Sequence, residues 1–536
     1  MKEPVGIVGA GTMGAGIAQV AAVAGHRVLV ADAVPGAAAR AVAGLRDRVR
    51  AQVARGRLTV DPDALDLTAV DEADALAGCA IVIEAIVEDL AAKRALFAEL
   101  ESVVTDGAIL ASNTSSLSPT ALAAGLAHPE RLVGLHFFNP VPAMRLVEVI
   151  SGLATAPEVA DAAAALAGTW GKTVVRSAAT PGFIVNRIAR PYYGEAWRLY
   201  EEHASVPENI DAILTGAGGF RMGPFALMDL IGHDVNEAVT RSVWAAFGYD
   251  PRFAPALGQR ALVEAGWLGR KSGRGVYPAG GAPAPVPAAP AAPPAAVTEH
   301  PAVPGASVPS ASSPGGRPVM LSALIARAGV RADLPARDPI LSTEGLVELP
   351  SGALLSISDG ATATMLASWL GRPVIVADRV LDPATAIALA CSDGCPASAA
   401  GEAVGLLQAA GLAVYVIEDT PGLVVTRTVA MLANLAFDAL ASRVASEPDI
   451  DTAMRLGVNY PLGPLAWGRQ WGVGTLLRIL DRLEDWYRDG RYRASPLLRQ
   501  AALVERLHGP RTYAEKLSAP PAGSAAASAG PATEDQ

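Results

Sequence analysis

Gly9-Ala10-Gly11-Thr12-Met13-Gly14 lies between an apolar run, Val5 to Val8, and a longer apolar stretch from Ile17 to Ala24. This order predicts a buried strand, a glycine-rich turn and a helix, the pattern that opens a dinucleotide-binding βαβ unit. The glycines allow a tight turn and close approach of the backbone to a pyrophosphate at the helix N-terminus. The predicted cofactor contacts in this turn are Gly9, Gly11, Thr12, Met13 and Gly14.

An acidic residue, Asp32, closes the next strand-like segment, His26 to Ala31. A carboxylate at this position can accept hydrogen bonds from the ribose hydroxyls of NAD and repels the 2′-phosphate of NADP. The sequence therefore predicts NAD as the cofactor. The alternative is a glycine-rich turn without a ligand, and the matching strand, helix and acid argue against it.

The composition is that of a mildly acidic globular chain that is too long for one core. Its 536 residues are 51% hydrophobic and carry a formal net charge of -10, so we expect three or four domains and no nucleic-acid partner. Three cysteines supply neither a disulfide framework nor a zinc site, so no metal is predicted. Without room for a signal peptide or an apolar run of membrane-spanning length, we expect a cytoplasmic protein.

Composition and periodicity divide the chain into six segments. Before Pro181, β-rich runs alternate with Ala-rich helical stretches, which is typical of a doubly wound α/β sheet, and helical segments follow. An Ala- and Pro-rich stretch then indicates a semi-extended linker. The predicted segments are a Rossmann-type NAD-binding domain (1–180), a first all-α domain for substrate binding or dimerisation (181–280), the linker (281–318), a degenerate Rossmann-like α/β segment (319–419), a second all-α domain (420–512) and a disordered tail (513–536).

The all-α domain is repeated at an offset of 240 residues. Several matches share this offset without a gap, which predicts a duplicated domain. The stretch before the second copy keeps strand-like pieces but has no glycine fingerprint, so it is predicted to be a shortened sheet without a dinucleotide turn. The matching pairs are Thr180-Pro181-Gly182 with Thr420-Pro421-Gly422, Ile210-Asp211 with Ile450-Asp451, Gly223-Pro224 with Gly463-Pro464, and Gly232 with Gly472.

Two polar passages follow strand-like runs, at the strand ends where α/β sheets bind ligands. These passages are Ser112-Asn113-Thr114-Ser115-Ser116 and His136-Phe137-Phe138-Asn139-Pro140. The next strand-like run holds Glu148 among aliphatic residues, and the intervening turn can bring this carboxylate near His136, because a buried charge needs a partner. An imidazole held by a carboxylate suits a general base that removes a proton from an alcohol.

Each of these residues also has a structural interpretation. His136 could be a core histidine, Glu148 an edge-strand charge facing water, and Ser115 the cap of a helix starting near Ser118-Pro119. The neighbouring NAD fingerprint favours catalysis, because dehydrogenation of an alcohol needs a base and donors that hold the oxygen.

Five motifs together resemble the L-3-hydroxyacyl-CoA dehydrogenase family over the first 280 residues. The resemblance implies NAD-dependent oxidation of an L-3-hydroxyacyl-CoA to the 3-ketoacyl-CoA. The second all-α domain is similar to that of longer bacterial members that act on 3-hydroxybutyryl-CoA or 3-hydroxyadipyl-CoA. The motifs are the glycine turn, 112–116, 136–140, 180–187 and 273–277.

The resemblance also implies residue roles. His136 would be the general base and Glu148 its orienting partner, while Ser115 and Asn186 would hydrogen-bond the reacting hydroxyl or the thioester carbonyl. Asn139 would be a further substrate contact. Positions that match the lining of the cofactor cleft are Glu88, Lys93, Asn113 and Ser115. From the residues alone, Glu88 is only a first-turn helix charge and Lys93 only a solvated one.

A cluster of arginines lies beside the nucleotide-binding motif of this acidic chain. Its cations could meet the 3′-phospho-ADP of an acyl-CoA, and we expect Arg55 and Arg57 to be substrate contacts. A solvated helix face is the alternative. The cluster consists of Arg46, Arg48, Arg50, Arg55 and Arg57.

The second half lacks the residues of a second active site. The offset takes Asn186 to Thr426, and no histidine lies between Pro301 and Ala502, so we expect one site per chain and a structural role for the second half. The family's all-α domains pair across a dimer, which implies either a homodimer or pairing of the two copies within one chain.

Two other functions stay open at this point. One is oxidation of a free 3-hydroxy acid on the same fold, in which case the arginine cluster would bind no CoA. The other is an NAD-binding scaffold or redox sensor without turnover, which would have no need of a base such as His136.

Overall fold

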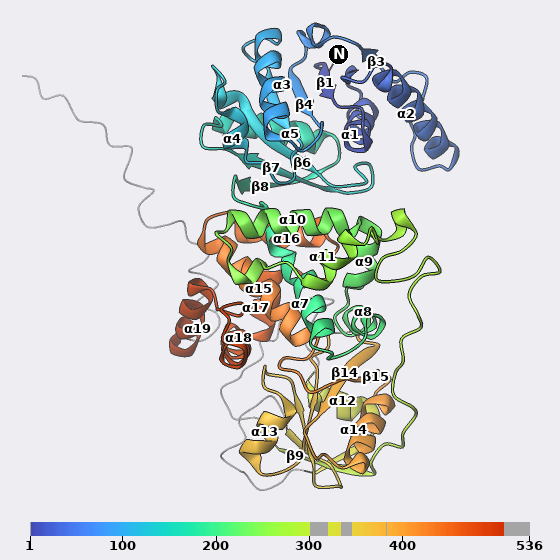
Figure 1. Cartoon of the computed structure of the whole chain (residues 1–536), viewed down its shortest axis with the longest axis vertical. Coiled ribbons are helices and arrows are strands. Elements are labelled where there is room, and N and C mark those ends of the chain that lie inside the picture. Colours follow the sequence, from blue (N-terminus) through green and yellow to red (C-terminus); the bar gives the residue numbers. More distant parts are fainter. Residues whose placement is uncertain (1, 301–319, 334–345, 382, 509–536) are drawn as a thin grey trace, which may run out of the picture.

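The computed structural model describes residues 2–300, 320–333, 346–381 and 383–508. Its first part is an eight-stranded sheet of order β3-β2-β1-β4-β5-β6-β7-β8 (Figure 1). All neighbouring strands are parallel except β6 and β7, which are antiparallel. The strands are β1 (Val5–Val8), β2 (Val28–Ala31), β3 (Leu67–Val70), β4 (Ile81–Glu84), β5 (Ile109–Ser112), β6 (Leu132–Phe137), β7 (Leu146–Ser151) and β8 (Thr173–Ala178).

Helices cover both faces of this sheet because its central strands are apolar on both sides. One core cluster joins the sheet to α1 (Thr12–Val23), α2 (Ala37–Ala54) and α5 (Pro157–Thr169). A second cluster joins the other face to α3 (Leu90–Val103) and α4 (Pro119–Ala123). The doubly wound fold predicted from the glycine turn is confirmed. The first domain also contains the short 3₁₀ helices η1 (Ala73–Leu76) and η2 (Pro129–Arg131), and the next domain contains η3 (Pro251–Phe253) and η4 (Arg270–Ser272).

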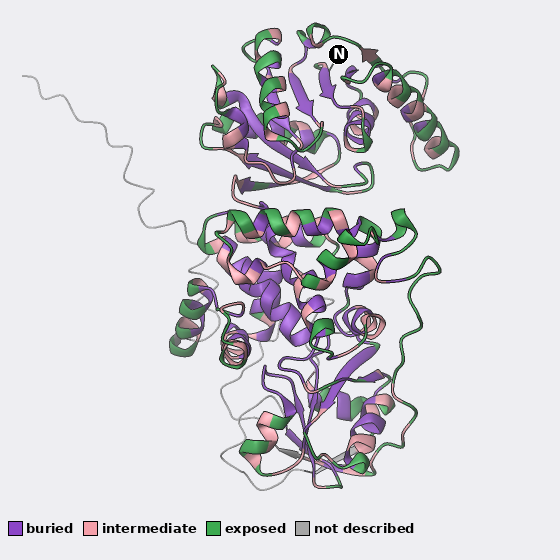
Figure 2. Ribbon diagram, in the orientation of Figure 1, coloured by how far each residue is buried: buried purple, intermediate pink, exposed green. Residues whose placement is uncertain are grey.

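The chain then forms a helical domain, as predicted. Helix α7 of this domain is buried along much of its length (Figure 2). The helices are α6 (Val185–Ile188), α7 (Arg190–Glu201), α8 (Pro207–Gly216), α9 (Pro224–Ile231), α10 (His233–Ala246) and α11 (Leu257–Glu264).

A second sheet of seven strands follows, in the order β10-β9-β11-β12-β13-β14-β15. Its last four strands repeat the pairing of β5 to β8, with one antiparallel pair, β13 and β14, between two parallel ones. The strands that would carry a dinucleotide turn are replaced. The elements are β9 (Ala296–His300), α12 (Leu321–Ala328), β10 (Arg331–Asp333), β11 (Leu346–Glu348), β12 (Leu354–Ile357), α13 (Ala363–Leu370), β13 (Val374–Ala377), β14 (Ala386–Cys391), α14 (Ala397–Ala409) and β15 (Ala413–Val416).

The linker expected over 281–318 is wrong at residues 296–300, which form β9 inside the second sheet. The strand forms because Val297 can be buried and the backbone pairs with both β10 and β11. Earlier in the same stretch, the Ala288 amide donates to the carbonyl of Val414 at 2.7 Å. Residues 281–295 of the predicted linker form no helix or strand, whereas 301–318 and the predicted tail, 513–536, lie outside the described residues.

The second helical domain repeats the first, as the 240-residue offset predicts. The offset also relates β7 to β14 and α5 to α14, so the duplication reaches back into the α/β part of the chain. The helices are α15 (Val425–Ala441), α16 (Glu447–Gly457), α17 (Pro464–Trp471), α18 (Val473–Tyr487) and α19 (Pro496–His508).

The two helical domains pack together between the two sheets (Figure 1). Helix α7 packs along α15, and each domain also reaches the sheet of the other half, α8 against β14 and α16 against β7 and β8. The backbone bonds that join the halves include a matched pair, Ala178 N to Val444 O at 2.7 Å and Glu418 N to Ala204 O at 3.0 Å. Because 178 and 418, and 204 and 444, are each 240 apart, these bonds are equivalent under the repeat.

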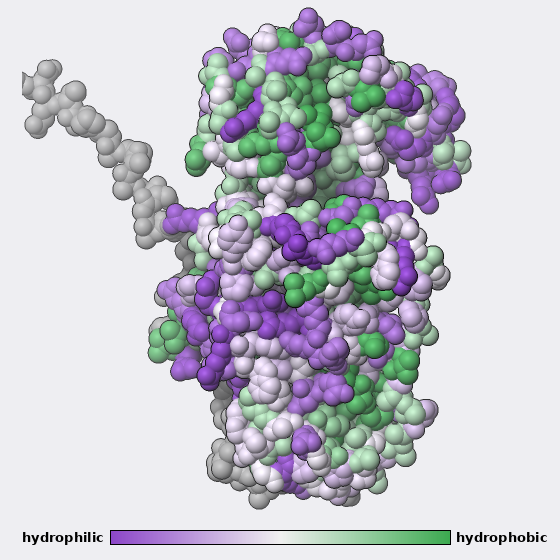
Figure 3. All heavy atoms as spheres, viewed as in Figure 1, coloured by the Kyte–Doolittle hydropathy of each residue, from purple (hydrophilic) through white to green (hydrophobic). Residues whose placement is uncertain are grey.

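The space-filling view shows the molecule narrowing between the first α/β domain and the helical layer (Figure 3). Across the part of the chain that the structure describes, no helix combines the length and apolar character needed to cross a membrane.

Candidate active site

The glycine turn is shaped by close backbone contacts. Gly9 has a φ of +104°, and a Cβ placed on it would lie 2.5 Å from the carbonyl oxygen of Ala85. A Cβ on Gly14 would lie 1.8 Å from the carbonyl oxygen of Gly9, so the helix can pack this tightly only with glycine. Around Gly11, in contrast, the described residues place no atom within 4 Å of such a Cβ, apart from the adjoining backbone. This open face at the N-terminus of α1, beside Thr12 and Met13, fits the pyrophosphate of a dinucleotide.

Asp32 lies beside this turn, at the end of β2. Its Oδ2 accepts a hydrogen bond from the Ala10 amide at 2.7 Å, and Oδ1 accepts from the Val34 amide at 2.8 Å. These two bonds hold the carboxylate in place and leave it lone pairs for other donors. The arrangement fits recognition of the ribose hydroxyls of NAD.

Lys93 is buried in a charged network behind the site, rather than solvated. Its ammonium group lies 2.6 Å from Glu84 Oε1 and 3.1 Å from Glu88 Oε2, and its side chain is 1% exposed. Burial of Glu88 opposes ionisation, but Lys93 and the hydroxyls of Thr114 and Ser116 outweigh it and hold the pKa of this carboxyl at about 2. Glu88 is therefore an anion in the folded protein.

Glu88 holds the loop after β5 in place. One of its oxygens, Oε1, accepts from the Thr114 hydroxyl at 2.6 Å and from the backbone amides of Ser115 and Ser116 at 2.9 and 3.0 Å. Asn113 fixes the other side of the loop, since its Oδ1 accepts from the Phe137 amide at 2.8 Å. The structure thus places these predicted cofactor-side residues in one network that positions Ser115.

His136 and Glu148 face each other across the antiparallel pair β6 and β7. The distance from His136 Nδ1 to Glu148 Oε2 is 2.6 Å, Glu148 is fully buried, and the His136 side chain is 6% exposed. The structure excludes the alternative in which Glu148 is an edge charge facing water. Because a carboxylate only accepts, Nδ1 carries the proton of this bond and Nε2 is left as an acceptor.

Glu148 also anchors the start of the helical domain. Its Oε1 accepts hydrogen bonds from the backbone amides of Ile184 and Val185, both at 3.1 Å. One carboxylate therefore orients the imidazole and fixes the helix that carries Asn186. The Asn186 amide donates to the carbonyl oxygen of Ser115 at 3.3 Å, which brings the predicted substrate-binding residues together.

Three other predicted contacts are exposed residues. Asn139 is exposed in the turn after β6, and Arg55 and Arg57 are exposed at the C-terminal end of α2. Two further arginines of the cluster serve the fold instead. Arg46 donates to three backbone carbonyls, including that of Leu65, and Arg50 bonds two aspartates, Asp47 and Asp63.

Sequence reasoning assigned no role to some residues that build the site. Glu84 accepts from the Ser112 hydroxyl at 2.6 Å and so links β4 to β5, and its position at the end of an apolar strand was the available signal. Phe138 and Phe183 flank the His136 ring, with centroid distances of 4.5 and 5.9 Å. Aromatic side chains next to an imidazole give no sequence pattern that distinguishes them from core residues.

The second sheet has an aspartate at the place of His136. Ala377 pairs with Leu389, and the next residue, Asp378, donates its backbone amide to Ala388 O at 2.9 Å. Since β14 is β7 displaced by 240 residues, Ala388 corresponds to Glu148, and Asp378 corresponds to His136.

The carboxylate of Asp378 accepts hydrogen bonds that hold the start of the second helical domain. It accepts from three successive backbone amides, those of Val424, Val425 and Thr426, from the Thr426 hydroxyl at 2.7 Å and from its neighbour's amide. Burial raises the pKa of Asp378 above its ordinary value of 3.8, while these donors lower it in part.

Comparison with known proteins agrees with this geometry. The description "3-hydroxyacyl-CoA dehydrogenase, NAD binding domain" matches residues 4–180, and that of the C-terminal domain matches 182–279 and again 422–512. A "3-hydroxybutyryl-CoA dehydrogenase reduced Rossmann-fold domain" matches 355–421. The chain belongs to the 3-hydroxyacyl-CoA dehydrogenase family. It is an oxidoreductase with a single NAD-binding domain and two copies of the C-terminal domain.

Individual relatives show how far the similarity extends. The 3-hydroxyadipyl-CoA dehydrogenase of Escherichia coli is 46% identical over 94% of this chain and 98% of its own. The crystal structure of 3-hydroxybutyryl-CoA dehydrogenase from Escherichia coli K12 has a TM-score of 0.81 and 45% identity, covering 94% of this chain and 98% of that one. The (S)-3-hydroxybutyryl-CoA dehydrogenase of Ralstonia eutropha has a TM-score of 0.50 and 40% identity, covering 52% of this chain but 99% of its own. A family member can therefore consist of one copy alone.

Proposed function

We propose that this protein oxidises an L-3-hydroxyacyl-CoA to the 3-ketoacyl-CoA, with His136 as the general base. The observation that carries the proposal is the 2.6 Å contact between His136 and the fully buried Glu148, in the same sheet as the NAD-binding turn. NAD, when bound, accepts the hydride from carbon 3 of the substrate. Nε2 of His136 takes the hydroxyl proton, and Glu148 stabilises the imidazolium that forms.

Ser115 and Asn186 position the reacting oxygen in this proposal. The Ser115 hydroxyl and the Asn186 amide can donate to the hydroxyl or to the thioester carbonyl, and the two residues already lie in contact. Hydrogen bonds aimed at the oxygen before the reaction need no reorganisation when its charge changes. Glu88 and Asn113 hold the loop of Ser115, so they act as positioning residues.

The substrate proposal rests on a curated sequence and a crystal structure, both from Escherichia coli K12 and of similar length to this chain, whose names differ in the acyl group. One acts on 3-hydroxyadipyl-CoA and the other on 3-hydroxybutyryl-CoA. We extend both to this chain as a short or dicarboxylic acyl thioester. Arg55 and Arg57, exposed at the end of α2, are the cations of the predicted cluster that we assign to the CoA phosphates.

The test is formation of NADH with L-3-hydroxybutyryl-CoA, L-3-hydroxyhexanoyl-CoA and L-3-hydroxyadipyl-CoA, each beside its free 3-hydroxy acid. We expect turnover of thioesters and little with the acids. Turnover of the free acids alone would support a 3-hydroxy acid dehydrogenase instead. NAD binding without turnover of any thioester would leave only a scaffold or sensor.

The second half, we further propose, takes the place of a second subunit. Support comes from the packing of α7 on α15 and from two buried arginines that cross between the copies. Arg187 lies 3.0 Å from Asp438, and Arg427, with no exposed side chain, lies 3.2 Å from Glu195. We expect the full chain to stay monomeric at 54.7 kDa and fully active on dilution. A loss of activity that follows dissociation of a larger species in ultracentrifugation would refute this arrangement in favour of a homodimer.

A further inference from the structure

Arg190, at the start of α7, is a buried cation without an acidic partner. Its side chain donates from Nε to the Asn186 carbonyl at 2.8 Å and from Nη1 to the Thr240 hydroxyl at 2.9 Å. Within the described ranges no carboxylate lies within ion-pair distance of Arg190, although the residue is only 6% exposed. Burial lowers the pKa of Arg190 below its ordinary value. A guanidinium buried without a counter-ion is costly and is the feature expected at an anion-binding site.

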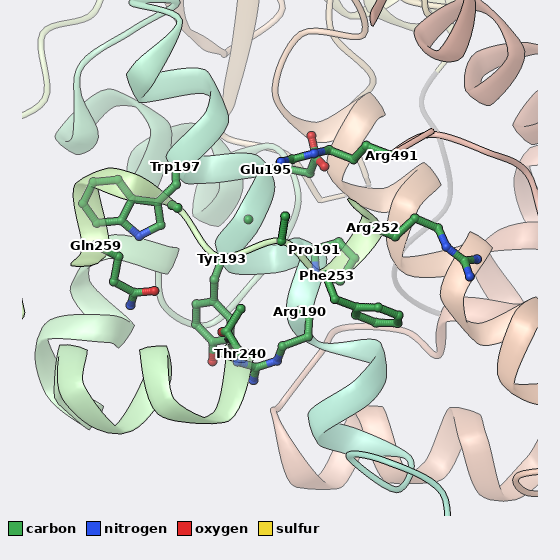
Figure 4. Close-up of a pocket in the computed structure, with 13 residues that line it drawn as sticks. Arg190, Pro191, Tyr193, Glu195, Trp197, Thr240, Arg252, Phe253, Gln259 and Arg491 are labelled. Atoms are coloured by element: carbon green, nitrogen blue, oxygen red, sulfur yellow. Dashed lines mark hydrogen bonds between the residues drawn. The ribbon is translucent and has the colours of Figure 1, made fainter. Parts of the chain in front are cut away.

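The surroundings of Arg190 leave it some space. Figure 4 shows its side chain beside Thr240 and Tyr193, where it lines a small cavity between α7 and the segment from Arg252 to Gln259. The other charged residues of the lining are Glu195, Arg252 and Arg491. The cavity has a volume of ≈ 20 Å³, which is room for about one water-sized group. The guanidinium also lies 5.1 Å from the centre of the Tyr193 ring.

Arg190 lies one helical turn beyond the substrate-binding asparagine. The backbone of Ala189, between α6 and α7, is itself helical, with φ −75° and ψ −9°. Side chains four residues apart on a helix are neighbours, with Cβ atoms about 5–6 Å apart. If Asn186 holds the oxygen at carbon 1 or 3 of the substrate, Arg190 is placed for the end of a six-carbon acyl chain.

Tyr460, from the second half, packs against the same helix, with its ring centroid 5.8 Å from that of Tyr192. Tyr460 is 5% exposed, and its hydroxyl has no hydrogen-bond partner in the described part of the chain. Burial raises the pKa of the Tyr460 hydroxyl above its ordinary value, and the nearby Arg190 cation opposes this rise. Its counterpart in the first copy is Phe220, so this buried hydroxyl occurs in one copy only.

The same segment of the second half also reaches residues next to the catalytic ones. A Cβ on Gly457, at the end of α16, would lie 3.0 Å from Val185 Cγ2 and 3.6 Å from Phe138 Cε1. Phe138 in turn contacts the His136 ring. The stretch from Gly457 to Tyr460 therefore runs from the neighbourhood of the base to that of Arg190.

We propose that Arg190, assisted by the Tyr460 hydroxyl, binds the terminal carboxylate of a dicarboxylic 3-hydroxyacyl-CoA. This assignment rests on the proposed function and names the substrate class of the same site. It also gives the second half a direct part in specificity, because Tyr460 belongs to the second copy. The repeat supports a specialised role, since Arg190 and Tyr193 correspond to Ala430 and Ala433.

The experiment compares L-3-hydroxyadipyl-CoA with L-3-hydroxyhexanoyl-CoA, which have the same chain length and differ in a terminal carboxylate or methyl group. We expect the wild-type kcat/KM to favour the adipyl substrate by about tenfold or more. Arg190→Met should lower kcat/KM for the adipyl substrate by about 10²-fold, mainly through KM, and leave the hexanoyl substrate unchanged or improved. Activity with L-3-hydroxyhexanoyl-CoA thus reports whether the variant is folded.

Two further variants sharpen the result. Tyr460→Phe restores the residue of the first copy and should reduce only adipyl kcat/KM, by about threefold to tenfold. Arg241→Met removes a half-exposed arginine next to Thr240 and should change neither substrate. Adipyl-CoA lacks the hydroxyl and cannot react. In calorimetry it should bind the Arg190→Met variant more weakly than it binds the wild-type protein.

Equal losses for both substrates in Arg190→Met would overturn the proposal and make Arg190 a support for Asn186. A wild-type protein that does not prefer the adipyl substrate would also overturn it. Either result leaves oxidation of 3-hydroxyacyl-CoA standing. Failure to oxidise any thioester would instead remove the proposed function itself.

Discussion

The two sheets of this chain share a framework but differ in the residues at its centre. In the first sheet, the facing pair on β6 and β7 is His136 and Glu148, and the carboxylate also accepts amides from the start of the helical domain. In the second sheet, the facing pair is Asp378 and Ala388, and the aspartate alone accepts the equivalent amides. The second half therefore keeps the hydrogen bonds from the helix start to a carboxylate of the sheet, but it has no imidazole at this position.

This difference separates the structural task of the carboxylate from its chemical one. A carboxylate at the helix start is needed in both halves, because three or four backbone amides there have no helical partner. Orientation of a base is needed once. The second half retains the packing that covers the first, through α16 on β7 and β8, and its sequence has no glycine fingerprint.

The largest expected effect is loss of the imidazole. His136→Gln should lower kcat for the best thioester by about 10²–10⁴-fold, the usual contribution of a positioned base. Binding of NAD, measured by calorimetry, should stay within a factor of two or so. If kcat is unchanged, His136 is not the base, and the contrast with Asp378 has no catalytic meaning.

A reciprocal exchange between the copies should have a smaller effect. Asn186→Thr installs the residue found at 426 in the second half and removes an amide donor, so we expect kcat/KM to fall by roughly 10–10²-fold. Thr426→Asn, the matched control, should leave kcat/KM unaltered even though it disturbs a bond to Asp378. Equal losses in the two variants would show that position 186 acts through folding.

Much of this contrast could be predicted from the sequence. The glycine turn, Asp32 and the 240-residue offset each follow from local rules of spacing, and the NAD domain and the duplicated helical domain are confirmed. The turn between β6 and β7 also indicated that Glu148 and His136 would meet. These inferences succeed because the decisive residues are close in sequence or repeat in register.

The remainder depends on contacts between distant segments. Lys93 is indistinguishable by pattern from a surface lysine until α3 packs it against Glu84. Strand β9 was predicted as linker because Ala- and Pro-rich sequence gives little strand signal, and its pairing partners lie on both sides of it in the sheet. The register that aligns Asp378 with His136 is two residues off the simple offset, so only strand pairing reveals it.

Loss of the Asp32 carboxylate, which faces the predicted cofactor site, should have a moderate effect on catalysis. Asp32→Ser removes the acceptor that fits the ribose hydroxyls, so we expect KM for NAD to rise about tenfold and the preference over NADP to shrink. Asp106→Ser, at an exposed position after α3, is the control and should alter neither value. An unchanged KM for NAD with Asp32→Ser would contradict the proposed site, which the second half entirely lacks.

The smallest effect on catalysis is expected from a substitution of Asp378, because this carboxylate binds the amides at the helix start and orients no base. Asp378→Asn retains the shape but removes an acceptor for several amides, so the free energy of unfolding should fall by about 1–3 kcal/mol, with kcat unaltered. Because burial raises the pKa of Asp378, its stabilising contribution is greatest at low pH and is lost as pH rises from about 3.8 through the raised value. The loss in free energy of unfolding caused by Asp378→Asn, measured by urea unfolding, should therefore become smaller with increasing pH. A penalty that grows with pH would show that the ionised carboxylate is the stabilising form, and a loss of kcat would show that the second half is not confined to structure.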